Sequence, residues 1–494
     1  MLVEVTRELH TQTVSSQSPD LATAFAKLFS AVCCHIDPNK AHEAEKTLSE
    51  GGYFTAFLRY ELAQRAANID RPADDAPEAD RATYASRKSS LSSRLADTGR
   101  HEEALNAARE ATDLYRTLVE HNPATYTPGL AMSLDNLANQ QASNGQLHDA
   151  LKNAQEATNL YRTLVEHNPA TYTPGLAMSL DNLANQQASN GQLHDALKNA
   201  QEATNLYRTL VEHNPATYTP GLAMSLDNLA RCLSENARLL DGLKNAQEAT
   251  NLYRTLAEHN PATYTPGLAG SLNDLANHLA DNRRHSEALK TAQEAVTIRR
   301  KLAEHNPAAY TPGLAMSLSN LANRFADNRR HREALKTAQE ATNLYRTLAE
   351  HNPATYTPNL AISLSNLANR FANNRRHREA LKTAQEATNL YRTLAEHNPA
   401  AHTPNLAISL NNLANRFANN RRHRKALKTA QEATNLYRTL AEHNPAAHTP
   451  NLTSSLKTYA NILEWSGSTK EAARIRQERD EVLKRMKELE EGDA

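Results

Sequence analysis

The sequence predicts an all-α fold, a right-handed superhelical solenoid of about nine helix-turn-helix hairpins. The first observation is a strict period: the string His-Asn-Pro recurs every 46 residues from Pro123 to Pro445. The second is that apolar residues within each period follow the spacing of amphipathic helices. The third is a composition with only 14 Gly and 7 Phe, which suits helices throughout. One such repeat cannot bury its apolar face alone, so neighbouring repeats must stack.

Each repeat is predicted to be a pair of helices, as residues 312–353 illustrate. One face of the first helix comprises Leu314, Leu318, Leu321 and Phe325. One face of the second helix comprises Ala334, Ala338, Ala341, Tyr345 and Leu348. A polar turn separates the two. We interpret Thr-Pro as the N-cap and first residue of the first helix, and Asn-Pro as the point where the second helix stops.

These residues resemble the tetratricopeptide repeat. The family's signature is a large-x2-large-small-x2-aromatic run, here Leu318-x2-Leu321-Ala322-x2-Phe325, followed by small residues on the second helix. Each repeat is longer than the family's usual ~34 residues. In this it is similar to the long-repeat branch typified by kinesin light chain, whose Leu-x-Asn-Leu-Ala string matches residues 134–138. The resemblance implies that the first helices line a concave groove that holds the ligand.

The chain is predicted to divide near residue 80. Residues 1–80 are interpreted as a helical N-terminal cap or, alternatively, a small docking region, with a helix at residues 53–67 and an acidic linker at the end. Residues 81–494 form the repeat array. Its last repeat, residues 450–494, is rich in charge on its second helix, which suits a C-terminal cap. Gly242 replaces the alanine of neighbouring repeats and predicts a weaker fourth repeat.

A stripe of asparagines is predicted on the face of each first helix opposite the core, a face that also carries Met316. An Asn carboxamide both accepts and donates hydrogen bonds, which suits the main chain of a bound peptide. We expect Asn→Ala substitutions to weaken binding and leave folding unchanged; alternatively, copied repeats copy Asn whether or not it is used. Trp465 falls in the stripe of the last repeat, as a binding anchor or as part of the cap. The candidate groove residues are Asn136, Asn139, Asn182, Asn185, Asn277, Asn320, Asn323, Asn366, Asn369, Asn412, Asn415, Asn461 and Trp465.

Formal net charge is zero, but charge changes sign along the array. Residues 128–173 carry four acidic and two basic side chains, whereas residues 404–449 carry two acidic and seven basic ones. The basic residues concentrate in turns, where they can hold an acidic peptide or nucleic-acid phosphates; alternatively, they form a solvated edge that needs no ligand. No aromatic residues alternate with them, so base stacking is unsupported. The candidate basic-edge residues are Arg329, Arg330, Arg332, Arg375, Arg376, Arg378, Arg421, Arg422 and Arg424.

Enzymes and metal-binding proteins are not supported by the sequence. It has no phosphate-binding glycine loop, nucleophile elbow or metal-ligand cluster, so we expect no activity, no catalytic or metal-binding residue and no cofactor. The histidine before each Asn-Pro is interpreted as a helix cap rather than a metal ligand. No apolar stretch is long enough to cross a membrane. Cys33, Cys34 and Cys232 show no disulfide or metal spacing, which predicts a reducing, cytoplasmic setting.

We predict a non-enzymatic scaffold or sensor that binds a peptide or protein segment in the groove. The expected partner is a protein or peptide, and an acidic one if the basic turns bind it. No membrane partner is expected. Nucleic acid bound through the basic C-terminal repeats is the alternative. A regulatory repeat array of a switch-type signalling system is a further alternative, based on resemblance alone. Because residues 127–172 and 173–218 are identical, these two repeats are predicted to be interchangeable.

Overall fold

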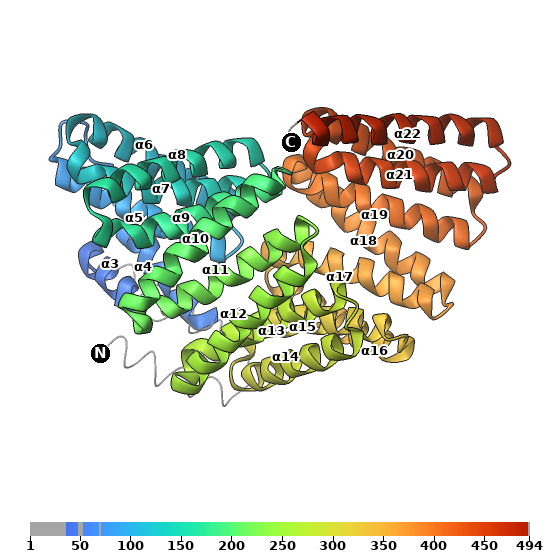
Figure 1. Cartoon of the computed structure of the whole chain (residues 1–494), viewed down its shortest axis with the longest axis horizontal. Coiled ribbons are helices and arrows are strands. Elements are labelled where there is room, and N and C mark those ends of the chain that lie inside the picture. Colours follow the sequence, from blue (N-terminus) through green and yellow to red (C-terminus); the bar gives the residue numbers. More distant parts are fainter. Residues whose placement is uncertain (1–35, 48–52, 69–70, 493–494) are drawn as a thin grey trace. The chain divides into compact units, whose positions relative to one another are not determined.

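The computed structural model describes residues 36–47, 53–68 and 71–492. In these ranges the chain forms twenty α-helices and no strand, so the all-α prediction is confirmed (Figure 1). Helix α3 (Pro38–Thr47) has no counterpart in the sequence-based prediction, whereas α4 (Tyr53–Ala67) has the predicted bounds. None of the described helices is both long enough and apolar enough to cross a membrane.

Nine hairpins follow α4, each made of a first helix and a second helix. The first helices are α5 (Glu78–Asp97), α7 (Pro123–Ser143), α9 (Pro169–Ser189), α11 (Pro215–Glu235), α13 (Pro261–Asp281), α15 (Pro307–Asp327), α17 (Pro353–Asn373), α19 (Pro399–Asn419) and α21 (Pro445–Trp465). The second helices are α6 (His101–His121), α8 (Leu147–His167), α10 (Leu193–His213), α12 (Leu239–His259), α14 (His285–His305), α16 (His331–His351), α18 (His377–His397), α20 (His423–His443) and α22 (Thr469–Gly492). Helices that follow one another pack side by side, as α11 does with α12 and α12 with α13. This is the stacked repeat architecture that the 46-residue period predicts.

The array divides within α15 into two compact bodies. The N-terminal body consists of the described residues up to Gln187 together with Leu193–Ser317, and the C-terminal body consists of the short segment Ala188–Gln192 and the described residues from Leu318 onward. Each body has its own apolar core of leucine, alanine and tyrosine side chains. In the N-terminal body one such cluster surrounds Tyr161 and Leu180, and in the C-terminal body a large cluster surrounds Tyr437 and Leu456.

A single asparagine joins each second helix to the next first helix. The backbone N–H of Asn122 donates to the carbonyl of Leu118, 2.9 Å away, at the end of α6. The side-chain oxygen of Asn122 accepts from the backbone N–H of Thr125 at 3.3 Å and so caps α7, which begins at Pro123. Proline suits the first helical position because its missing N–H is not needed there. The Asn-Pro string is therefore the predicted stop of one helix and also the start of the next.

The prediction that Thr-Pro begins each first helix is wrong, because this string lies inside the helix. Pro128 sits in the second turn of α7. The Thr127 hydroxyl donates to the carbonyl of Pro123 at 2.7 Å and satisfies that group. Pro128 has no N–H to offer the carbonyl of Ala124, but Ala124 is exposed and water can serve instead. Each first helix therefore starts earlier than predicted.

Tyrosines of the second helices pack against glycines of the following first helices. A Cβ atom added to Gly175 would lie only 2.5 Å from Cε1 of Tyr161. A side chain here would collide with the ring where it now lies, so the glycine allows this close contact. The same pairing recurs at Gly129 and Tyr115, Gly221 and Tyr207, and Gly267 and Tyr253. Later repeats have asparagine at the equivalent position, namely Asn359, Asn405 and Asn451.

Buried aspartates link successive first helices in the N-terminal body. The Ser179 hydroxyl of α9 donates to Oδ1 of Asp135 in α7 at 3.1 Å. Equivalent bonds of 3.2 Å join Ser225 to Asp181 and Ser271 to Asp227. In the next repeat Asn273 takes the aspartate's place, and its Nδ2 donates to Oγ of Ser317 at 2.7 Å.

Burial raises the pKa of each of these aspartates. For Asp135 the pKa rises to about 7, and hydrogen bonds from Ser179 and Asn182 offset only part of the desolvation. The pKa of Asp181 also rises to about 7. That of Asp227 rises to about 8, with the charge of Asp274 adding to the effect of burial. Below about pH 7 the folded chain therefore favours the protonated form of all three carboxyl groups.

Ion pairs join successive second helices between residues 40 apart. They are Arg116–Glu156, Arg162–Glu202, Arg208–Glu248, Arg254–Glu294, Arg346–Glu386, Arg392–Glu432 and Arg438–Glu478. The paired side chains are about half exposed, so each pair is expected to contribute only ~0–1 kcal/mol. Their main consequence is that every repeat presents the same contacts to its neighbours.

Gly242 reflects close packing between α11 and α12. A Cβ atom there would lie 2.8 Å from the backbone oxygen of Ala230 and 2.5 Å from Oγ of Ser234. The sequence predicts a weaker repeat because glycine costs ~1 kcal/mol in a helix. The structure adds that alanine would collide with backbone, so the glycine permits a tighter hairpin.

Candidate functional site

Most of the large apolar side chains exposed on the described surface share one position of the first helices. This apolar column consists of Met132, Met178, Met224 and Met316 in the N-terminal body and Ile362 and Ile408 in the C-terminal body. Their exposed fractions lie between 43% and 58%. Buried leucines already supply the core, so these side chains are not needed for packing between helices. A run of exposed apolar side chains on a folded protein marks an interaction surface.

The predicted groove asparagines lie on the same side of the first helices, one and two turns beyond the apolar column. Asn139 and Trp465 are exposed, and Trp465 is the last residue of α21. The others are half-buried, namely Asn136, Asn182, Asn185, Asn277, Asn320, Asn323, Asn366, Asn369, Asn412, Asn415 and Asn461.

Several of these asparagines bond to a neighbouring repeat. Nδ2 of Asn136 donates to the carbonyl of Ser89 at 3.3 Å, and Oδ1 of Asn369 accepts from Arg416 at 3.1 Å. The expectation that the stripe takes no part in packing is therefore wrong for Asn136 and Asn369. Their replacement by alanine would leave a hydrogen-bonding group of the neighbour without its partner, at a cost of ~1–3 kcal/mol.

Arginines add positive charge to this face of the C-terminal body. Arg370 and Arg416 lie half-buried between first helices, and their guanidinium groups contact Asn323 and Asn369 of the preceding repeat. Burial lowers the pKa of both side chains from its ordinary high value, but arginine remains charged. The sequence showed these residues only as part of a charge count, because their position depends on how neighbouring helices pack.

The predicted basic edge lies in the turns between the helices of the C-terminal body. Arg329, Arg375 and Arg421 are exposed and have left-handed backbones, with φ of 59°, 59° and 56°. The first three repeats place glycine at this position, as at Gly99 and Gly145, and the next two place Ala237 and Arg283 there with φ of 60° and 61°. A left-handed residue with a side chain costs ~1 kcal/mol relative to glycine, so arginine is kept here against a conformational cost.

The rest of the basic edge differs in its ion pairing. Arg330 and Arg376 pair with Glu333 and Glu379 at 2.9 and 2.8 Å, respectively. The two guanidinium groups also lie over the rings of Phe325 and Phe371. The remaining predicted residues, Arg332, Arg378, Arg422 and Arg424, are exposed.

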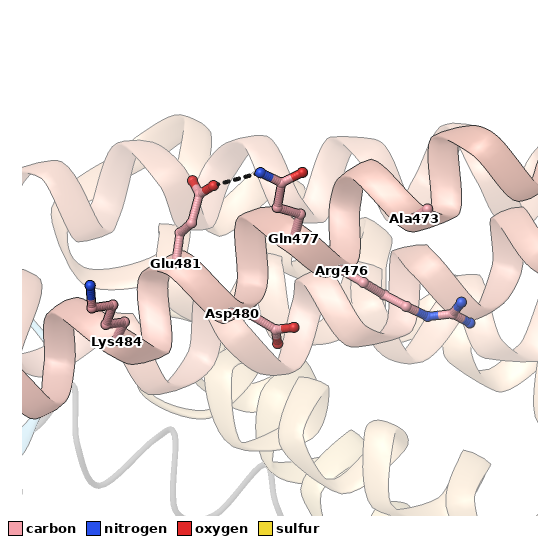
Figure 2. Close-up of a pocket in the computed structure, with 6 residues that line it drawn as sticks. All are labelled: Ala473, Arg476, Gln477, Asp480, Glu481 and Lys484. Carbon is pink, nitrogen blue, oxygen red and sulfur yellow. Dashed lines mark hydrogen bonds between the residues drawn. The ribbon is translucent and has the colours of Figure 1, made fainter.

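A shallow pocket runs along one side of α22 (Figure 2). Its lining is polar, and Nε2 of Gln477 donates to Oε1 of Glu481 at 3.0 Å. The equivalent side of α20 is buried against α21, with the Thr434 hydroxyl 3.0 Å from that of Ser455. The position on α22 that is equivalent to Thr434, 46 residues later, is Asp480, and Arg476 lies one turn before it. This surface is a helix face on which charge replaces small side chains, and it carries no convergent binding groups.

The described residues contain no group of three or more His, Cys, Asp or Glu side chains placed to hold a metal ion. The repeated histidine lies at the end of each second helix, and Nδ1 of His351 is 2.7 Å from the carbonyl oxygen of Thr347. Cys232 is buried, and burial raises the pKa of its thiol to about 11. Cys33 and Cys34 lie outside the described residues.

Comparison with known proteins identifies the repeat. Residues 85–124 and 268–307 match the family model of the tetratricopeptide repeat. These segments fall on the hairpins α5–α6 and α13–α14, and the repeats between them share the same 46-residue period. No curated protein matches the chain.

Three solved structures illustrate what the chain is similar to. BtubC (BKLC) from P. vanneervenii is 17% identical over 50% of this chain and 92% of that one, with a TM-score of 0.42. A Podosopora anserina protein described as a kinesin light chain with nearly identical TPR-like repeats is 18% identical over 45% of this chain and 97% of that one, with a TM-score of 0.35. A Rap protein complexed with Competence and Sporulation Factor is 12% identical over 84% of this chain and 99% of that one, with a TM-score of 0.48.

Proposed function

We propose that this chain, an array of tetratricopeptide repeats, is a non-enzymatic interaction scaffold that binds a protein segment on the exposed face of its first helices. The observation that carries the proposal is the apolar column, which recurs in six of the nine hairpins and stands outside the buried core. A bound segment would place apolar side chains against the methionines and isoleucines, because each Å² of apolar surface that is buried stabilises the complex by ~25 cal/mol. Methionine also adapts its shape to different partners.

The asparagines beside the apolar column give the same face hydrogen-bonding capacity. Oδ1 of Asn139 accepts from Gln186 at 3.2 Å, and Oδ1 of Asn369 accepts from Arg416. Both carboxamide NH2 groups lack a partner among the described residues. They can donate to the main-chain carbonyls of a bound segment, as the sequence predicts for this stripe.

The proposal is tested by removing the apolar character of the column. The full chain is used to select binders from a displayed library of random 16-residue peptides, and the selected peptides are titrated against variants. Met132→Gln, Met178→Gln, Met224→Gln and Met316→Gln together should weaken binding at least tenfold, because apolar contact is lost while helix propensity is kept.

The matched control lies on the other helix of the repeat. Gln155 and Asn159 are exposed on α8 and bond only to each other within that helix, so Gln155→Ala with Asn159→Ala should leave binding unchanged. Undiminished binding by the methionine variant, with a normal thermal melt, would contradict the proposed function.

Binding of an acidic ligand by the basic edge is a second candidate. It is favoured by the arginines at positions 329, 375 and 421, which keep a left-handed backbone at a position where the first three repeats have glycine. Changing all three to glycine should raise thermal stability slightly and reduce binding of poly-glutamate severalfold at physiological salt. Unchanged poly-glutamate binding by a more stable variant would leave the basic edge as a solvated surface. Single-stranded DNA serves as the parallel probe for the nucleic-acid alternative.

A further inference from the structure

Position 299 departs from the pattern of the other second helices. Seven of them carry tyrosine at the equivalent place, namely Tyr115, Tyr161, Tyr207, Tyr253, Tyr345, Tyr391 and Tyr437. In α14 the residue is Arg299. Its guanidinium group takes the place of the tyrosine ring, since a Cβ atom on Gly313 would lie 2.7 Å from its Nη1. A cation therefore occupies a site that the array otherwise fills with an aromatic ring.

Arg299 has no acidic partner among the residues that the structure describes. Its side chain is half-buried, and its Nε is buried without a hydrogen-bond partner in the described part of the chain. Desolvation by burial lowers its pKa, and Tyr310 offsets part of this effect. A buried charge without a counter-ion is costly, so the site favours any ligand that brings a negative charge.

An opening in the apolar column lies directly over Arg299. The column runs Met132, Met178 and Met224, and then Gly270 interrupts it before Met316. A Cβ atom on Gly270 would lie 3.8 Å from Nη2 of Arg299, and no described atom beyond the surrounding turns of α13 is closer. A ligand atom that enters where a methionine side chain would otherwise stand therefore comes within hydrogen-bonding reach of the guanidinium group.

We propose that Arg299 binds the side-chain carboxylate of a protein segment that lies on the apolar column, through the notch at Gly270. This inference rests on the proposed function and adds the chemistry of one required residue, an Asp or Glu flanked by apolar side chains. Arginine and carboxylate form paired, charge-assisted hydrogen bonds. In a half-buried site these bonds are stronger than on an open surface.

One acidic residue of the chain lies near the notch, and its charge opposes the binding of a carboxylate there. Asp274 is one turn beyond Gly270 on α13 and is exposed. Desolvation raises the pKa of Asp274 to about 6, and the charge of Arg231 offsets part of this effect; the charge of Asp274 in turn raises the pKa of Asp227. Asp274→Asn, which restores the asparagine that most repeats carry here, is expected to tighten binding of an acidic segment severalfold.

Two variants separate the proposed contact from folding. Arg299→Tyr restores the residue of the other repeats, and Gly313 already leaves room for its ring, as Gly175 does for Tyr161. Gly270→Met completes the apolar column and covers the guanidinium group, while residue 299 remains an arginine. Both variants should melt at or above the temperature of the parent chain.

The experiment is a double-mutant cycle on library peptides. Peptides of 16 residues selected on the full chain are expected to share an Asp or Glu between apolar positions, and peptides selected on Arg299→Tyr are expected to lack it. For a selected peptide, changing that acid to its amide should weaken binding to the parent about tenfold and leave binding to Arg299→Tyr and Gly270→Met unchanged.

Equal effects of the amide on parent and variants, or no shared acid among the parent's peptides, would overturn the inference. If Arg299→Tyr fails to fold, Gly270→Met decides the question by the same comparison. The methionine-to-glutamine variant described above keeps the two proposals apart. If it weakens binding while the cycle shows no coupling, only the role of Arg299 fails; if it has no effect, the proposed function fails.

Discussion

Replacing Asp135, Asp181 and Asp227 with asparagine is expected to raise the stability of the array at pH 8 and to flatten its dependence on pH. In an unfolded chain an aspartate titrates near pH 4. In the folded chain burial raises the pKa to about 7 for Asp135 and Asp181 and to about 8 for Asp227. The folded state therefore binds more protons than the unfolded state between about pH 4 and pH 8.

The sign of the effect follows from this difference in proton binding. Below about pH 4 the carboxyl groups are protonated in both states and impose no penalty. As pH rises from about 4 to about 8 the folded state loses stability relative to the unfolded state, because the unfolded chain releases these protons freely while the folded chain must either hold them or bury the charges. Each asparagine should recover ~1–3 kcal/mol at pH 8. Arg231 near Asp181 and Asp274 near Asp227 modify the size of the effect but not its sign.

The chain contains its own control for this substitution. Asn273 occupies the aspartate position in the fourth of these repeats and donates to Ser317, so asparagine fits the site and keeps the hydrogen bond. Urea midpoints of the parent and the triple variant at pH 5 and pH 8 measure the effect. A parent midpoint that does not fall relative to the variant's between these two pH values would show that the carboxyl groups are solvated.

Deleting residues 127–172 is the second change with a large expected effect, because it removes one whole repeat. The new junction of Tyr126 and Thr173 recreates the sequence of a first helix, since residues 127–172 and 173–218 are identical. Arg116, which pairs with Glu156, then meets Glu202 in the same place. The shortened chain should keep its helix content per residue and its cooperative melt.

Circular dichroism and calorimetry of parent and deletion variant provide the measurement. Deletion of residues 268–313 is the matched control of equal length, because it also removes Arg299 and the notch at Gly270 and so should abolish any selection for acidic peptides. A molten or insoluble product from the first deletion would show that identical repeats are not interchangeable.

Local signals account for the parts of the fold that could be predicted. The spacing of leucines and alanines and the recurring Asn-Pro string act within one helix or at one joint, so they predicted nine hairpins and the stop at each asparagine. The tetratricopeptide resemblance suggested by Leu318, Leu321 and Phe325 agrees with the observed helical hairpins and with the family model, which matches two other repeats, residues 85–124 and 268–307. Thr-Pro was misplaced because proline is tolerated both at the start of a helix and in its early turns, and only the Asn122 cap distinguishes the two.

Contacts between repeats could not be predicted in the same way. They depend on how far one hairpin is rotated and shifted against the next, which no single-repeat pattern contains. The bond from Arg416 to Asn369 and the ion pairs between residues 40 apart are of this kind. For the same reason the sequence analysis singled out the asparagine stripe and not Met132 and Met178. Only the packed structure shows that these methionines are exposed and not needed for packing between helices. Arg299 was visible as a break in a repeated tyrosine, a signal that a repeat-by-repeat comparison would have found.

The near-identity of the contacts between repeats also poses a problem for the chain while it folds. Helix α8 meets Ser179 of α9 through Thr158, but α11 offers the same surface through Ser225. A chain that docks α8 on α11 skips one repeat and leaves it as a loop, and closing a loop of that length costs little extra entropy. Such slipped alignments are misfolded states with native-like contacts, and misassembly of this kind is a characteristic failure of repeat proteins. Residues that differ along the array include Cys232, His278 and Arg299. Their contacts fit only the correct alignment and therefore lower its free energy relative to the slipped ones.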